Sequence, residues 1–115
     1  MDIEKELRTA LVTVGLPAPV YLDVPSERPA ELYSVELTGE SSREGGALHS
    51  ATVAVQCWSA SRSRARELFD ALQSALPRIG YQSSRIGRAT LEGGYRFDDL
   101  ASGTPRYQAV VRVTY

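Results

Sequence analysis

Residues 51–76 read ATVAVQCWSASRSRARELFDALQSAL, and this stretch decides the fold. Apolar side chains occupy every second position over residues 51–57, which is the period of a β-strand with one buried face. Over residues 65–76 they recur three and four positions apart, as on the buried side of an α-helix. Ser59 or Ser61 can cap the start of that helix. The stretch therefore predicts a half-buried strand followed directly by a long amphipathic helix.

The chain before this stretch predicts a helix and two strands. Helical spacing of apolar residues predicts a helix over residues 2–14, which a glycine and a proline should stop. Prolines bound a short strand at 20–24, which we expect at a sheet edge. Alternation predicts a longer strand over residues 31–38. Residues 39–46 are rich in Gly and Ser and predict a long flexible hairpin loop.

The chain after this stretch predicts two further strands. Pro77 should end the long helix. Alternation predicts strands over residues 88–92 and 107–115, and the Gly-Gly pair at 93–94 predicts a bend or bulge after the first of them. The order of elements is αβββαββ. We therefore expect a single α+β domain over residues 1–115, in which two helices pack on one face of a mainly antiparallel four-stranded sheet.

Composition excludes several classes of protein. The chain is 43% hydrophobic and 23% charged, as in ordinary globular domains. Its 13 basic and 14 acidic residues give a net charge of -1, so there is no cationic surplus for specific nucleic-acid binding. The single cysteine rules out an internal disulfide. The N-terminal residues alternate in charge and no apolar run is long enough to cross a membrane, so we expect a cytosolic protein.

Neither a catalytic nor a metal site is expected. His49 and Cys57 are the only residues of their types, and on one strand they would lie about 26 Å apart, too far for a nucleophile and its base. Asp98 and Asp99, with Glu92, form the densest carboxylate group. Because adjacent residues of an extended chain point in opposite directions, we interpret them as a turn whose carboxylates accept local backbone amides. We therefore expect that the chain is not an enzyme and binds no cofactor.

Surface residues are expected on the long helix and on the sheet face turned away from the helices. Arg64 and Arg66 stand three and four residues before acidic partners, which favours a solvated helix surface over an anion site. Alternation places Trp58 on the far sheet face, either shielded by a loop or in contact with another subunit. The other residues expected on that face are polar: Ser34, Glu36, Thr52, Gln56, Arg106, Gln108 and Arg112.

Three stretches of the sequence carry a family resemblance. The first runs from Pro19-Val20-Tyr21 through Val24-Pro25 to Thr38-Gly39, the second is Val53-Ala-Val-Gln-Cys-Trp58 running into the Ser61-capped helix, and the third is Gly103-Thr-Pro-Arg-Tyr-Gln108. Together they resemble the tail terminator, or tail completion, proteins of long-tailed bacteriophages and related prophages. The resemblance spans most of the chain. Glu40 departs from it, because such proteins often have a second glycine there.

The resemblance implies a virion protein at the head-proximal end of the tail, assembled in the host cytoplasm. It would form a ring, expected to be hexameric, that caps the tail tube, ends its polymerisation and provides the surface for head joining. Its implied partners are further copies of itself, the major tail tube protein and the head-tail connector protein, without cofactor, specific nucleic acid or membrane. The expected subunit or tube interface comprises Trp58, Gln56, Arg43, Glu44, Arg96, Asp98, Asp99 and Arg106, on the far sheet face and in loops 39–47 and 93–105.

Two alternatives stay open. One is another head-tail junction protein, such as a neck or minor capsid component. The other is a small-molecule or nucleic-acid binding module on a ferredoxin-like sheet, in which exposed aromatic side chains stack on a ligand. The sequence offers Trp58 but no second aromatic residue aligned with it on the expected face.

Overall fold

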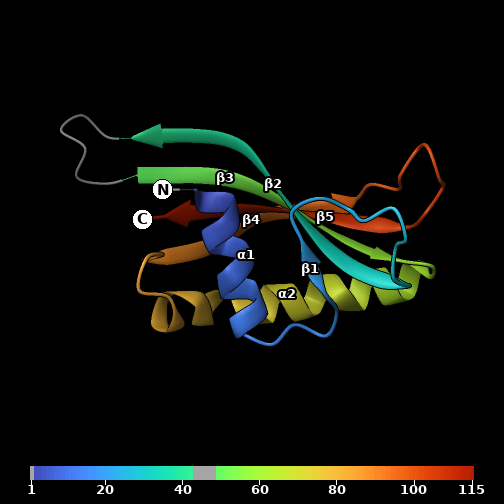
Figure 1. Cartoon of the computed structure of the whole chain (residues 1–115), viewed down its shortest axis with the longest axis horizontal. Coiled ribbons are helices and arrows are strands. Elements are labelled where there is room, and N and C mark those ends of the chain that lie inside the picture. The colour runs from blue at the N-terminus through green and yellow to red at the C-terminus, as the bar shows by residue number, and fades with distance from the viewer. Residues whose placement is uncertain (1, 43–48) are drawn as a thin grey trace.

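The computed structural model describes residues 2–42 and 49–115 (Figure 1). In the described residues the elements follow the order expected from the sequence. Their bounds are α1 (Ile3–Thr13), β1 (Val20–Tyr21), β2 (Glu31–Ser42), β3 (His49–Ser59), α2 (Arg62–Gln82), β4 (Arg88–Arg96) and β5 (Arg106–Thr114). None of the described helices is both long enough and apolar enough to cross a membrane.

The strands form one mixed sheet of five in the order β1-β2-β3-β5-β4. The four long strands are antiparallel to their neighbours, as predicted, but β1 adds a fifth strand that runs parallel to β2. The predicted number of strands in the sheet, four, was therefore wrong, because the sheet has five. The edge position predicted for residues 20–24 is confirmed, although only Val20 and Tyr21 pair, opposite Tyr33 and Ser34. A pairing of two residues is too short for sequence periodicity to reveal.

Both helices pack on the same face of the sheet and contact one another, as predicted. One apolar core contains Leu7 and Leu11 of α1, Leu72 of α2, and the alternating residues of the strands, such as Val53 and Val55. The buried Tyr33 hydroxyl joins the sheet to α2 by donating a 2.6 Å hydrogen bond to the Leu68 carbonyl. Desolvation by burial raises the pKa of that hydroxyl above its ordinary value.

The second helix does not end at Pro77 but continues to Gln82. Proline already has a helical φ and removes only one hydrogen bond, the one to the Gln73 carbonyl. Beyond it, Ile79 is fully buried, so the apolar stripe continues and compensates for the lost bond. At the other end Ser61 is the N-cap, because its side chain accepts the backbone N–H of Arg64. The cap prediction for Ser61 is confirmed.

Two of the predicted loops are partly strand. β2 extends through Ser42, so residues 39–42 of the expected hairpin loop pair with β3, and residues 43–48 lie outside the described part of the chain. β4 continues through the Gly-Gly pair to Arg96, with a register shift between Leu91 and Gly93. The bulge predicted from the two glycines is therefore confirmed, whereas the prediction that the strand ends at residue 92 was wrong.

Gly94 gives a direct test of how closely α2 packs on β4. A Cβ at this position would lie 2.2 Å from the Phe69 ring, which itself packs against Tyr107 and Arg66. We expect Gly94→Ala to lower the free energy of unfolding by about 1–3 kcal/mol, because the ring must move. Urea titration measures this. The control is Gly93→Ala, whose Cβ would meet nothing within 4 Å, and equal stability of the two variants would contradict the packing described here.

Candidate interaction surface

A chain of side-chain hydrogen bonds crosses the sheet face turned away from the helices. The Trp58 indole N–H donates to Ser34 Oγ at 2.9 Å, and Ser34 Oγ donates to Gln56 Oε1 at 2.7 Å. Gln56 Nε2 then donates to Gln108 Oε1 at 3.1 Å, and Gln108 Nε2 donates to the Tyr95 hydroxyl at 2.7 Å. We call these five residues the polar ladder. It ties together all four long strands.

The inner part of the polar ladder is buried. Ser34 and Gln56 are each only 6% exposed, although both are polar. A buried polar group must find a partner inside the protein or bear the cost of lost hydration. In the described residues no buried side-chain nitrogen or oxygen lacks a hydrogen-bond partner. The rungs between Trp58, Ser34 and Gln56 are therefore fixed by one another rather than by solvent, and Gln108 continues the ladder to the exposed Tyr95.

Trp58 lies on the expected face and is shielded there, being only 7% exposed. The Arg106 guanidinium lies over its ring at 4.7 Å from the centroid, and that of Arg28 lies at 5.3 Å. Of the two alternatives for this side chain, the shielded one is confirmed, with Arg28 supplied by the segment between β1 and β2. A hollow of about 330 Å³ beside it is lined by polar residues including Glu36, Gln56 and Arg106.

Arg106 links the polar ladder to the turn between β4 and β5. Its guanidinium lies between the rings of Trp58 and Phe97, at 4.7 and 4.8 Å from their centroids. Its Nε also donates to the Phe97 carbonyl at 2.6 Å. Such cation–π contacts strengthen when the cation is partly desolvated. The start of the turn is therefore held on the sheet by a side chain of β5.

The turn itself is closed by local hydrogen bonds. Asp99 accepts the backbone N–H and the hydroxyl of Ser102, at 3.1 and 2.5 Å, which confirms the prediction of a carboxylate bonded to local amides. Asp98 instead forms a two-point ion pair with Arg96. These hydrogen bonds hold the pKa of both carboxyl groups below the ordinary value. Gly103 occupies the left-handed region, with φ at +70°.

Three apolar side chains stand exposed on and beside this turn. Tyr95 and Phe97 pack edge to face and are each almost half exposed, and Leu100 is 96% exposed. We call these residues the apolar tip. The sequence did not reveal this tip, because Tyr95 and Phe97 follow the Gly-Gly pair where the strand was expected to end. The register shift after Leu91 also places them on the face opposite to Ala89 and Leu91, which the alternation of the sequence does not indicate.

The structure separates the other candidate residues. Cys57 is buried in the core, whereas His49 stacks on Tyr115 at the end of the sheet. Glu92 pairs with Arg112 and is not joined to the carboxylates of the turn. The described residues contain no group of three or more potential metal ligands. Of the expected interface residues, Trp58, Gln56, Arg96, Asp98, Asp99 and Arg106 lie along the ladder and turn, and Arg43 and Glu44 fall outside the described residues.

Two of the three arginines at the start of α2, Arg64 and Arg66, have carboxylate partners in the described structure. Arg64 contacts Glu67 at 2.8 Å and also Glu31 of β2 at 2.5 Å. Arg66 contacts Asp70 at 3.1 Å. The predicted pairs within the helix are confirmed, and Arg64 additionally ties the helix to the sheet. These positive charges are compensated locally, as on an ordinary solvated helix surface.

Comparison with models of known protein families gives no match, and no curated protein sequence is significantly similar to this chain. The geometry of the molecule therefore has to supply the argument about function.

Cys57 gives a test of the core assignment. Desolvation raises the pKa of its thiol above the ordinary value, so the thiolate that reacts with alkylating agents is scarce in the folded protein. We expect no modification by iodoacetamide at mildly alkaline pH, and rapid modification once the chain is unfolded in urea, measured by mass spectrometry. Rapid modification of the folded protein would contradict the burial of this side chain.

Ser34 gives a test of the polar ladder. Ser34→Ala leaves the Trp58 N–H and the Gln56 carbonyl oxygen without their partner, so we expect a loss of about 1–3 kcal/mol in the free energy of unfolding. The matched control is Ser84→Ala, at an exposed position. Urea titration followed by the fluorescence of the single tryptophan measures both variants. A change no larger than that of the control would show that the ladder does not stabilise the sheet.

Proposed function

We propose that this chain is a structural subunit of a long bacteriophage tail. In this proposal it is a tail terminator that forms a ring, hexameric as the resemblance implies, on the end of the tail tube. The ring ends polymerisation of the tube and offers the surface to which the head is joined. Its partners are further copies of itself, the major tail tube protein and the head-tail connector protein.

The observation that carries the proposal is the apolar tip. Exposed aromatic and leucine side chains are typical anchors of protein interfaces when they can enter a pocket of a partner. Here the Tyr95 hydroxyl is bonded to Gln108 and the Phe97 ring lies against Arg106, so these two side chains lose less freedom on binding than unrestrained ones would. Such a preorganised surface supports a binding role, in agreement with the three stretches that resemble tail terminators.

The environment of Trp58 argues against the nucleic-acid alternative. Base stacking requires an open ring face, as in proteins that bind single strands through aromatic platforms. The Trp58 ring is instead covered by the guanidinium groups of Arg28 and Arg106. A base would have to displace both. The exposed Tyr95 and Phe97 rings meet at 67° rather than forming a continuous platform.

A substitution in the apolar tip tests the proposed contact with the tail tube. We expect Leu100→Glu to abolish capping of tubes assembled from the major tail tube protein, because a charge replaces the most exposed apolar side chain of the tip. Electron microscopy of tube ends and tube lengths measures the effect. The control is Val12→Glu, which changes a half-exposed residue on α1. Neither variant should lower the melting temperature.

The outcomes separate the alternatives. Wild-type protein that gives rings at tube ends and limits tube length supports the terminator role. Uniform tubes with and without the protein, together with binding to head connectors, would assign it to the head-tail junction instead. Salt-sensitive binding of single-stranded DNA or RNA in place of either would overturn the structural role.

A further inference from the structure

Charge is distributed unequally across the width of the sheet. Residues 1–48 contain nine of the 14 acidic residues and four of the 13 basic ones, which gives a formal charge of -5. Residues 49–115 contain the other five acidic and nine basic residues, which gives +4. Between the two halves lies β3, which carries no Asp, Glu, Lys or Arg. Because β3 is the middle strand, the division in sequence becomes a division in space.

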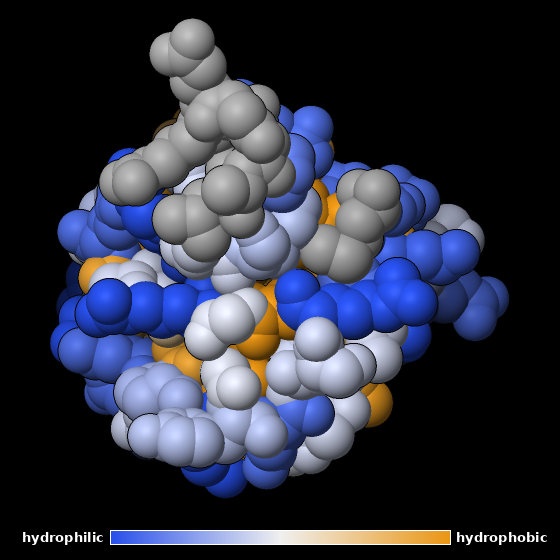
Figure 2. Space-filling view, turned by 90° about the vertical axis from the view of Figure 1, so that its left-hand side faces the viewer, coloured by the Kyte–Doolittle hydropathy of each residue, from blue (hydrophilic) through white to orange (hydrophobic). Residues whose placement is uncertain are grey.

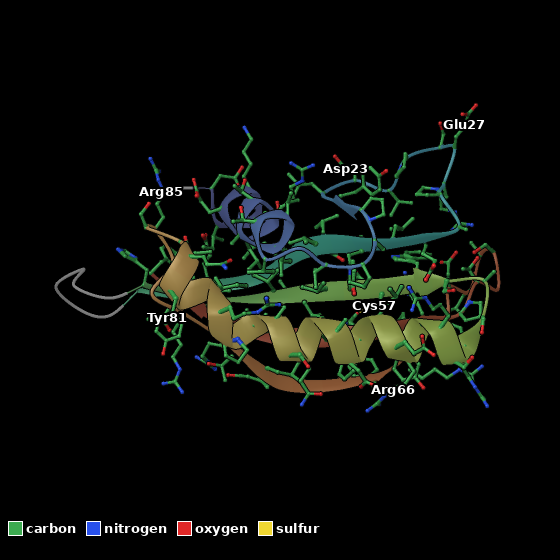
Figure 3. All side chains as sticks on the ribbon, turned by 90° about the horizontal axis from the view of Figure 1, so that it is seen from below. Asp23, Glu27, Cys57, Arg66, Tyr81 and Arg85 are labelled. Carbon is green, nitrogen blue, oxygen red and sulfur yellow. The ribbon has the colours of Figure 1, made fainter. Side chains whose placement is uncertain are left out.

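Among the exposed charges that enter no ion pair in the described structure, four carboxylates lie towards one edge of the sheet and two arginines towards the other. On the side of β1 and β2, the acidic margin consists of Asp23, Glu27, Glu36 and Glu40, which are exposed and enter no ion pair in the described structure. On the side of β4, the basic margin consists of Arg78 and Arg88, which are equally exposed and unpaired there. Figure 3 shows Asp23 and Glu27 on one side of the molecule and Tyr81, beside the basic margin, on the other.

The two edges of the sheet also differ in how they are covered. At the acidic edge, β1 pairs with part of β2, and farther along Glu4 of α1 accepts the backbone N–H of Leu37 at 2.7 Å. At the basic edge no described strand pairs with the outer side of β4, which is nine residues long. An uncovered edge of this length invites pairing with another chain. One edge is therefore protected and the other is open.

A groove runs beside the open edge. It has a volume of about 620 Å³ and lies between the second half of α2 and β4. Its lining includes Leu76, Pro77, Tyr81, Arg88, Ala89 and Leu91. Tyr81 is 92% exposed, which is unusual for an aromatic side chain. The end of the molecule that carries the termini shows small hydrophobic patches among hydrophilic residues (Figure 2).

We propose that copies of this chain associate head to tail, with the acidic margin of one copy against the basic margin and open β4 edge of the next. Opposite charges face each other in this arrangement. A symmetric pairing of two β4 edges would instead bring Arg78 and Arg88 of both copies to one interface, where like charges repel. Head-to-tail contacts join two different patches and generate a ring when the rotation closes. Only that closure rests on the function proposed above.

Charge reversal on each margin gives a direct test. The first variant carries Arg78→Glu and Arg88→Glu, and the second reverses the whole acidic margin with Asp23→Arg, Glu27→Arg, Glu36→Arg and Glu40→Arg. Each has two margins of like charge, so each alone should associate at least about tenfold more weakly than the wild type. Mixed together they should associate again, because each margin of one variant then complements the margins of the other. An alternating ring of six satisfies this pairing, and sedimentation velocity measures all three samples.

Lys5→Glu with Arg62→Glu changes the net charge as much as the first variant does, at positions outside the basic margin, and should leave association unchanged. Association of the wild type should weaken as salt is raised. A wild type that stays monomeric, or a mixture that stays dissociated, would overturn head-to-tail association. A wild type that forms dimers and no larger assembly would show the symmetric β4 pairing instead.

The two proposals fail in different ways. Complementation between the reversed variants, with no effect of the wild type on tail tubes, would leave head-to-tail association in place and remove the tail terminator role. If both charge-reversed variants cap tail tubes as the wild type does, the tail terminator role would stand and head-to-tail association through the two margins would be removed. In that case the copies would be held together by contacts other than the two margins.

Discussion

Burial of β3 on both faces is the constraint on which the rest of this structure depends. From Val53 to Ser59 every residue of the strand is buried. On the side of the helices this is ordinary core packing, because Val53, Val55 and Cys57 are apolar. On the other side Gln56 and Trp58 carry polar groups, which need partners when they leave water. The neighbouring strands must therefore supply hydrogen bonds at the correct register.

The polar ladder meets that requirement and has a consequence at the surface. Ser34 and Gln108 stand opposite Gln56 in the sheet, and Tyr95 stands opposite Gln108. The same side chains that satisfy the buried groups thus determine the position of the exposed Tyr95. Arg106 extends this order to the turn by contacting both Trp58 and Phe97. A contact surface built in this way is shaped before any partner arrives.

The central position of β3 also separates the charges of the chain. An acidic first half and a basic second half would have no directional effect if their strands were interleaved in the sheet. Here α1, β1 and β2 lie on one side of β3, and α2, β4 and β5 contribute the other. The edges consequently differ in charge and in cover. That asymmetry is the physical basis for joining unlike edges rather than like ones.

The sequence by itself determined the helices and long strands, their order and the packing of both helices on one face of the sheet. It also determined the cap at Ser61 and the separation of His49 from Cys57. Each of these follows from local periodicity or spacing. The sequence predicted the short edge strand at 20–24 but not its parallel pairing with β2, since two paired residues have no period. It misplaced the end of α2, because burial of Ile79 outweighs the cost of Pro77. Only the tertiary structure decided that Trp58 is covered by Arg28 and Arg106, that Tyr95 and Phe97 form an exposed tip, and that opposite charges reach opposite edges. Those features depend on which distant residues become neighbours, and strand order and register set this, not local sequence.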